Sequence, residues 1–191
     1  MGVVNTMSNV ASVLKKYDDV FCSDRGVIAG ITLCREHECC TSAVALAYIA
    51  IDSLGCLTMD KRQREATGAD FRRIASQHIG PSVGATADEL WAARCGLLHC
   101  YAAESRLSRE KPQVMKLVYK YGHVKQTHNV EGWVMIDLDK LIDRLVKAMA
   151  SIRRKIEGGE LDPILVGKRL TMMFNPVRSS QMYQHLVRGK R

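Results

Sequence analysis

The stretch LWAARCGLLHCY, residues 90–101, places an arginine and a histidine inside a run of small and apolar residues. A helix this apolar is typical of a protein core, where an arginine is costly unless another group pairs with it. The preceding residues offer Thr86 or Asp88 as an N-cap and put acidic side chains in the first turn. We therefore expect a helix through this stretch, in which Arg94 and His99 have a specific role.

The spacing of the two residues constrains that role. On a helical wheel Tyr101 falls about 20° from Arg94, whereas His99 lies about 140° from it. This predicts that Arg94 and His99 do not form a compact pair on one ideal helix. They would instead flank a shared groove or meet the same residues of a second subunit. In a purely structural alternative, Arg94 pairs with Asp52 of an earlier helix in an ion-pair network.

Hydrophobic periodicity along the rest of the chain predicts a mostly α-helical protein. Two β-branched and aromatic runs, VMKLVYKYG and GWVMIDL, predict a β-hairpin with a long loop. Asp137 or Asp139 is the expected N-cap of the helix that follows this hairpin. The expected helices are Val3 to Phe21, about Glu36 to Leu57, Phe71 to Ile79 with an end at Gly80-Pro81, Leu138 to Ile156, and Pro163 to Phe174.

These elements suggest three segments. Residues 1–110 are expected to form a helical bundle. Residues 111–175 would contribute the hairpin and additional amphipathic helices, packed on the bundle as one unit. Residues 176–191 read as a basic, loosely ordered tail.

The composition favours a polyanionic partner. The chain has 191 residues and a net charge of +8, from 28 Lys and Arg against 20 Asp and Glu. Such a balance points to nucleic acid ahead of a membrane surface. Part of the excess lies near the C-terminus, because six basic residues and no acidic one follow from Lys168 onward.

Seven cysteines without a paired framework indicate a reducing, cytoplasmic compartment, in which most thiols act as small buried hydrophobes. The cluster CREHECC holds four potential metal ligands, but adjacent Cys39 and Cys40 do not easily share one tetrahedral ion. We expect a helix start with two buried thiols there, and neither a metal nor a cofactor. The longest apolar run, residues 43–51, is short of the ~20 residues that span a bilayer, so no membrane partner is expected.

An arginine beside a histidine suits phosphate chemistry. Arginine stays charged and offers a planar fork of donors to a phosphate. Histidine moves protons near neutral pH. An RNA strand carries its own nucleophile, the 2′-hydroxyl, so such a site requires no metal.

Arginine, four residues and histidine near the end of a helix resemble the signature of the HEPN superfamily, and LWAARCGLLH is similar to the LY-x-x-RC-x-LLH form of bacterial HEPN-like proteins. The resemblance covers residues 1–110 and implies a HEPN-like helical bundle. Similar members are metal-independent ribonucleases, commonly prokaryotic toxins or phage-defence effectors; others are non-catalytic RNA-binding or partner-binding modules. In the family two protomers form one composite cleft, which implies a homodimer.

The resemblance assigns roles to individual residues. Arg94 would orient the phosphate and stabilise the transition state, and His99 would transfer a proton during 2′-hydroxyl attack. Tyr101 matches the tyrosine that toxins of this kind present to an antitoxin nucleotidyltransferase, and a packed aromatic is its structural alternative. Cys95 departs from the polar residue that often follows the arginine in active members. Glu104 is expected either near Arg94, at the cleft, or at the end of the helix.

Overall fold

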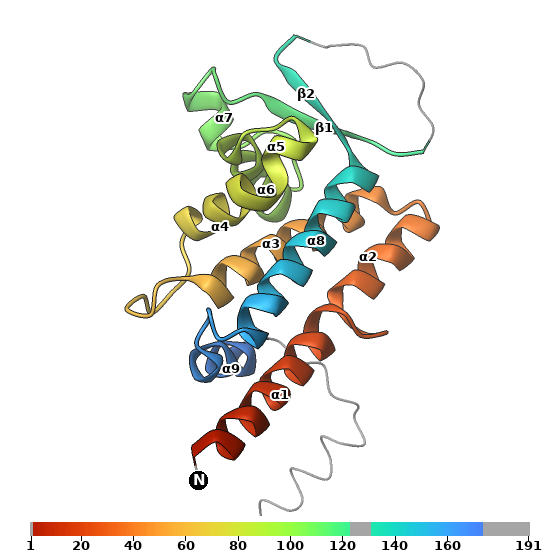
Figure 1. Cartoon of the computed structure of the whole chain (residues 1–191). Coiled ribbons are helices and arrows are strands. Elements are labelled where there is room, and N and C mark those ends of the chain that lie inside the picture. Colours follow the sequence, from red (N-terminus) through yellow and green to blue (C-terminus); the bar gives the residue numbers. More distant parts are fainter. Residues whose placement is uncertain (1, 123–130, 174–191) are drawn as a thin grey trace, which may run out of the picture.

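The computed structural model describes residues 2–122 and 131–173 (Figure 1). The described residues are mainly helical, which confirms the mostly α prediction. The predicted tail, 176–191, lies outside them. The elements are α1 (Gly2–Phe21), α2 (Val27–Glu36), α3 (Cys40–Thr58), α4 (Gly68–Ile74), a π-helical turn η1 (Ala75–Ile79), α5 (Gly80–Val83), α6 (Ala87–Cys100), α7 (Arg106–Glu110), β1 (Lys116–Lys120), β2 (Trp133–Asp137), α8 (Leu138–Glu157) and α9 (Pro163–Met172).

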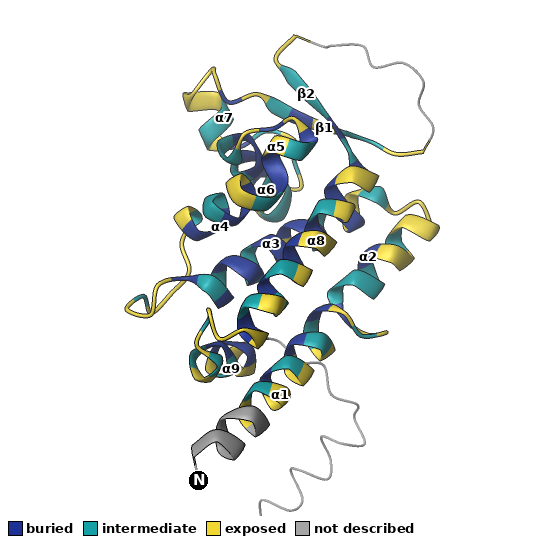
Figure 2. Cartoon of the chain, in the orientation of Figure 1, coloured by how far each residue is buried: buried dark blue, intermediate teal, exposed yellow. Residues whose placement is uncertain are grey.

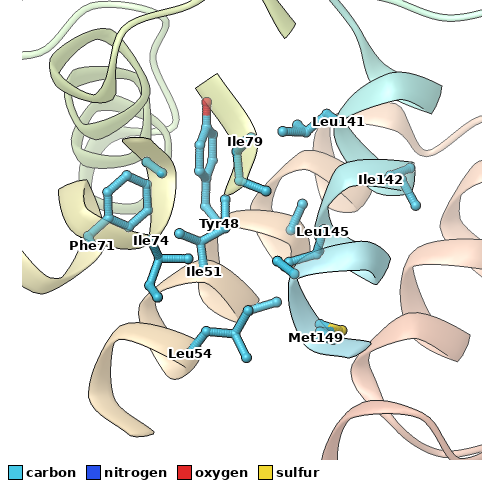
Figure 3. Packing of buried hydrophobic residues seen from close by; sticks show 14 of the residues in the cluster. Tyr48, Ile51, Leu54, Phe71, Ile74, Ile79, Leu141, Ile142, Leu145 and Met149 are labelled. Carbon is cyan, nitrogen blue, oxygen red and sulfur yellow. The ribbon is translucent and has the colours of Figure 1, made fainter. Parts of the chain in front are cut away.

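Helix α3 occupies the middle of the fold (Figures 1 and 2). Its buried side chains pack between α8 on one side and α4 with η1 on the other, as Figure 3 shows around Tyr48, Ile51 and Leu54. By length and composition alone α3 could cross a membrane, but half of its most apolar window is buried inside the protein. This burial fits the central helix of a soluble fold.

Helix α8 follows its predicted amphipathic pattern. Seven apolar residues at helical spacing along its inner face are buried: Leu138, Leu141, Ile142, Leu145, Met149, Ile152 and Ile156. Asp137 is its N-cap and accepts a hydrogen bond from the Lys140 amide at 3.1 Å. The buried Tyr17 hydroxyl of α1 donates to the Met149 carbonyl at 2.9 Å, which ties α1 to α8.

The two strands do not form the predicted hairpin. They pair in parallel, with Lys116 opposite Trp133 and Lys120 opposite Asp137. Parallel strands need a connection of about a dozen residues or more, and the distance in sequence from Lys120 to Trp133 is long enough for one. In this direction β2 runs straight into α8 (Figure 1), so Ile136 and Leu138 both enter the core. Strand propensity identifies the two elements but does not encode their relative direction.

Three smaller predictions are also wrong. Helix α2 is missing from the helices that the sequence predicts; it begins directly after Gly26 and includes Gly30. The helical run beyond η1 continues past Gly80-Pro81 to Val83. None of the seven cysteines is buried: Cys22, Cys39 and Cys100 are exposed and the others are half-buried. The expected helix start is present, since α3 begins at Cys40.

Candidate functional site

Helix α6 begins at a capping box. The Thr86 hydroxyl accepts from the Glu89 amide at 3.2 Å, and the Glu89 carboxylate accepts from the Thr86 amide at 2.7 Å. Thr86 is therefore the N-cap, and Asp88 instead binds Arg72 of α4 at 2.5 Å. Such a reciprocal cap satisfies two amides that a helix start otherwise leaves unpaired. It fixes the register of the helix that carries Arg94 and His99.

The C-terminal end of α6 depends on Gly96. Tyr101 turns the chain in the left-handed conformation with a φ of 51°, and its amide donates to the Leu97 carbonyl at 3.0 Å. The following residues fold back over the helix. A Cβ at Gly96 would lie 2.7 Å from the Ala102 oxygen and 2.9 Å from the Glu104 oxygen. Only glycine permits this close approach of the backbone.

Arg94 connects Asp52 of α3 with His99 of its own helix. Its Nε donates to Asp52 Oδ2 at 2.7 Å, and its Nη1 lies 3.0 Å from His99 Nε2. The prediction that Arg94 and His99 form no compact pair within one helix is wrong. A wheel describes where side chains leave the axis, whereas the long arginine side chain carries its donors to the imidazole. The alternative pairing of Arg94 with Asp52 is present in the structure.

The contact assigns a role to one nitrogen of the imidazole. A guanidinium only donates hydrogen bonds, so His99 Nε2 is the acceptor in this contact. His99 is exposed at the last turn of α6, whereas the Arg94 and Asp52 side chains are only 19% and 28% exposed. The basic nitrogen of a solvent-facing histidine is thus held by a largely sheltered arginine.

Burial dominates the electrostatics of Asp52. Desolvation raises its pKa above the ordinary value, and the hydrogen bond and charge of Arg94 oppose this rise, with a smaller contribution from His99. The guanidinium of Arg94 also lies 5.1 Å from the Trp91 ring, a distance compatible with a cation–π contact. Asp52 and Trp91 together fix the arginine in one orientation.

A cavity of about 350 Å³ adjoins this cluster. Three exposed basic residues, Lys61, Arg62 and Arg64, lie in the loop that leads to one of its walls, together with the exposed acidic residues Asp60 and Glu65. The basic excess and Arg94 suit an anionic ligand, although Asp52 adds one negative charge to the wall. The lining residues are Asp52, Ser53, Cys56, Ala66, Thr67, Gly68, Trp91, Arg94 and Met173.

The remaining predicted residues are placed differently. Tyr101 is 72% exposed, and Cys95 is half-buried on α6. Glu104 does not join Arg94; it lies beyond the helix end and binds Lys116 of β1 at 2.8 Å. Among the described residues, no group of three His, Cys, Asp or Glu side chains is arranged to hold a metal ion.

Sequence reasoning missed Trp91 and Arg72. Arg72 lies 5.1 Å from the Trp91 ring, the same distance as Arg94. Trp91 precedes Arg94 by three residues, a spacing that brings side chains together on a helix and could have identified this contact. Nothing in the local sequence indicates that α4 brings Arg72 to the same ring. Comparisons of the chain with family models, curated proteins and solved structures find no match.

Proposed function

We propose that this protein is a metal-independent endoribonuclease of HEPN type that cleaves RNA by attack of a 2′-hydroxyl. The observation that carries the proposal is the contact between Arg94 Nη1 and His99 Nε2 at the exposed end of α6. It joins a permanent cation to a solvent-accessible base. These are the two groups that transesterification of RNA requires.

Each residue has a distinct part in the proposed reaction. His99 Nε2 accepts the proton of the 2′-hydroxyl when the incoming RNA displaces Arg94 Nη1 from that nitrogen. The 2′-oxygen then bonds to phosphorus while the bond from phosphorus to the 5′-oxygen breaks. The leaving 5′-oxygen takes a proton from a water molecule, and the resulting hydroxide removes the proton that His99 accepted. The freed Nη1 of Arg94 neutralises the charge that develops on the phosphate. The product carries a 2′,3′-cyclic phosphate.

Asp52 supports the reaction indirectly. It binds Nε of Arg94, while Nη1 of the same guanidinium contacts His99. An arginine held in this way loses less freedom when it binds a phosphate, so more of the interaction energy is available in the transition state. The net charge of +8 and the basic residues 61–64 favour the approach of RNA.

The ion pair between Asp52 and Arg94 favours a second function. A partly buried ion pair of this kind also occurs where an arginine only stabilises a fold. In that case the protein is a non-catalytic RNA-binding or partner-binding HEPN module. The two functions differ in whether His99 takes part in cleavage of the RNA.

The biological setting is proposed from the motif resemblance alone. It comprises a homodimer, a cytoplasmic prokaryotic toxin or phage-defence effector, and an antitoxin that acts on Tyr101. Because Arg94 and His99 meet within one chain, the helical wheel no longer supports the dimer.

The test is cleavage of mixed single-stranded RNA in EDTA. Wild-type protein is expected to produce fragments ending in a 2′,3′-cyclic phosphate, and His99→Ala to lower the rate at least ~100-fold. His37→Ala, which removes another exposed histidine, is the matched control and keeps full activity. RNA that stays intact but is retarded in a gel in a salt-dependent manner would favour the binding module. Growth arrest by wild type but not by His99→Ala in a bacterial host extends the test to cells.

A further inference from the structure

A second cavity, of about 380 Å³, lies along another flank of α6, between that helix, the start of α3 and the two strands. Val44, Ala93, Leu97 and Leu117 give it an apolar lining, and four aromatic residues, Tyr101, Tyr119, Tyr121 and Trp133, complete it. Its volume is at the lower end of the ~300–1,000 Å³ typical of sites for small ligands. The cavity is therefore large enough for one planar group and too small for a nucleic-acid helix.

Tyr101 takes up an unfavourable backbone conformation beside this cavity. Its φ of 51° lies in the left-handed region, where helix ends usually have glycine or asparagine. The side chain gains no burial in return, because it is 72% exposed. An exposed aromatic ring held in a strained conformation points to a role in binding rather than in packing.

The other aromatic residues divide into a closed side and an open side. The Tyr119 hydroxyl is hydrogen-bonded to the buried hydroxyl of Tyr48, so this ring belongs to the core. Tyr121 is 52% exposed, and the half-buried Trp133 has the Lys116 ammonium 5.5 Å from its ring centre. Tyr101, Tyr121 and Trp133 are thus the rings that an entering group would meet.

The chemistry of the described lining favours a neutral ligand. Among the described residues that line this cavity none is Asp, Glu, Lys, Arg or His. Its polar side-chain groups are the hydroxyls of Thr41 and the tyrosines, the thiol of Cys40 and the indole N–H of Trp133. A neutral planar group with polar edges matches this surface. Unstacked nucleobases are recognised in this way, on aromatic side chains.

We propose that this cavity binds one unpaired nucleobase of the RNA substrate, with Tyr101 as its stacking residue. The inference rests on the proposed ribonuclease function. Tyr101 follows His99 by two residues, so the base cavity and the phosphate site lie at the same end of α6. The strand would place a phosphate at Arg94 and His99 and a neighbouring base against Tyr101. The protein would therefore prefer single-stranded RNA with an unstacked base at the cleavage site.

The experiment separates the ring of Tyr101 from its backbone conformation. Tyr101→Asn removes the ring and tolerates the left-handed region, so the variant folds at least as stably as wild type. Tyr101→Phe keeps the ring and is the matched control. The probe is a single-stranded 2′-O-methyl 12-mer of uridylate, which cannot be cleaved. Its reference is a 12-mer with the same backbone and abasic sugars.

We expect Tyr101→Asn to weaken binding of the 12-mer about 10-fold and Tyr101→Phe to bind it like wild type. The abasic strand should bind weakly and equally to all three proteins. The inference is overturned if Tyr101→Asn binds the 12-mer as wild type does, or if it loses affinity equally for the abasic strand. It is also overturned if Tyr101→Asn changes only the oligomeric state, because the ring would then contact a second copy of the chain.

A second measurement keeps this result distinct from the ribonuclease assay. Adenosine has no phosphate, and we expect it to shift the methyl NMR signals of Val44, Leu97 and Leu117 in a saturable way. If adenosine does so but His99→Ala cleaves RNA like wild type, the proposed function fails and the cavity stands. If cleavage requires His99 while adenosine shifts none of these signals, the base cavity fails and the proposed function stands.

Discussion

Nη1 of Arg94 lies 3.0 Å from Nε2 of His99 within one chain, although the two residues are five positions apart on a helix. Residues at this spacing do not normally face each other. Asp52 binds Nε of the same guanidinium at 2.7 Å. We therefore assign Asp52 as a positioning residue for the proposed reaction, and its removal should slow catalysis without weakening RNA binding.

Asp52→Asn should lower the rate of RNA cleavage about 10-fold and leave RNA binding unchanged or tighter. The amide still accepts from Nε but more weakly than a carboxylate, so Arg94 is held less firmly. The substitution also removes a negative charge from the cavity wall. Cleavage rates at saturating RNA and gel-shift affinities measure the two effects. The control is Asp143→Asn, which breaks the exposed pair with Lys147. Wild-type cleavage by Asp52→Asn would contradict this assignment.

Arg94→Gln should raise the pKa of Asp52 further above its ordinary value. Burial already raises it, and the hydrogen bond and charge of Arg94 are the main influences that lower it. His99→Gln should give a smaller rise in the same direction, because His99 contributes less. The pH dependence of the Asp52 carboxyl ¹³C shift measures both values. A lower Asp52 pKa in either variant would show that the replaced side chain does not lower the pKa of this carboxyl group.

The raised pKa of Asp52 gives the free energy of unfolding a defined pH dependence. A carboxyl group with a raised folded-state pKa binds protons more strongly in the folded state, so stability falls as the pH rises from the unfolded value, 3.8, to the folded one. In Arg94→Gln this window is wider, and the loss of stability above it is larger than in wild type. Urea unfolding at a series of pH values tests this sign. In Asp52→Asn the corresponding pH dependence should be absent.

Much of the fold follows from local sequence patterns. The helix starts at Thr86 and Asp137 and the inner face of α8 depend on residues within a few positions of each other. The sequence alone therefore finds the inner face and places each N-cap within two residues, and the structure selects Thr86 over Asp88 and Asp137 over Asp139. The direction in which β1 and β2 pair depends on where β2 leads, and β2 leads into the helix that fills the core. Arg94 and His99 are evident from their motif. Their contact was missed because it depends on a third residue, Asp52, from another helix.

Gly96→Ala should destabilise the protein by about 2 kcal/mol, since its Cβ would lie within 2.9 Å of two carbonyl oxygens in the turn after α6. For a chain of this size the melting temperature should fall by about 6 °C. Gly30→Ala is the matched control, because its Cβ would meet only the Leu46 side chain, at 3.4 Å. Calorimetry should show Gly30→Ala to be neutral or more stable, as expected for alanine in a helix. Equal losses in both variants would mean that the turn can adjust.

Arg169→Ala should be the most destabilising of these substitutions, at about 3 kcal/mol. Arg169 of α9 is buried and ends at the C-terminus of α3, where it donates to the carbonyls of Leu57, Met59 and Asp60 at 2.8–2.9 Å. Its loss leaves these oxygens without the donor that caps the helix, and it removes a cation from the negative end of the helix dipole. Lys168→Ala, an exposed neighbour, should change stability by less than ~0.5 kcal/mol.

Because α3 leads into the basic loop at 61–64, Arg169→Ala should also increase amide exchange in that loop. If the loop exchanges as in wild type, Arg169 stabilises the core without ordering the entrance to the candidate site.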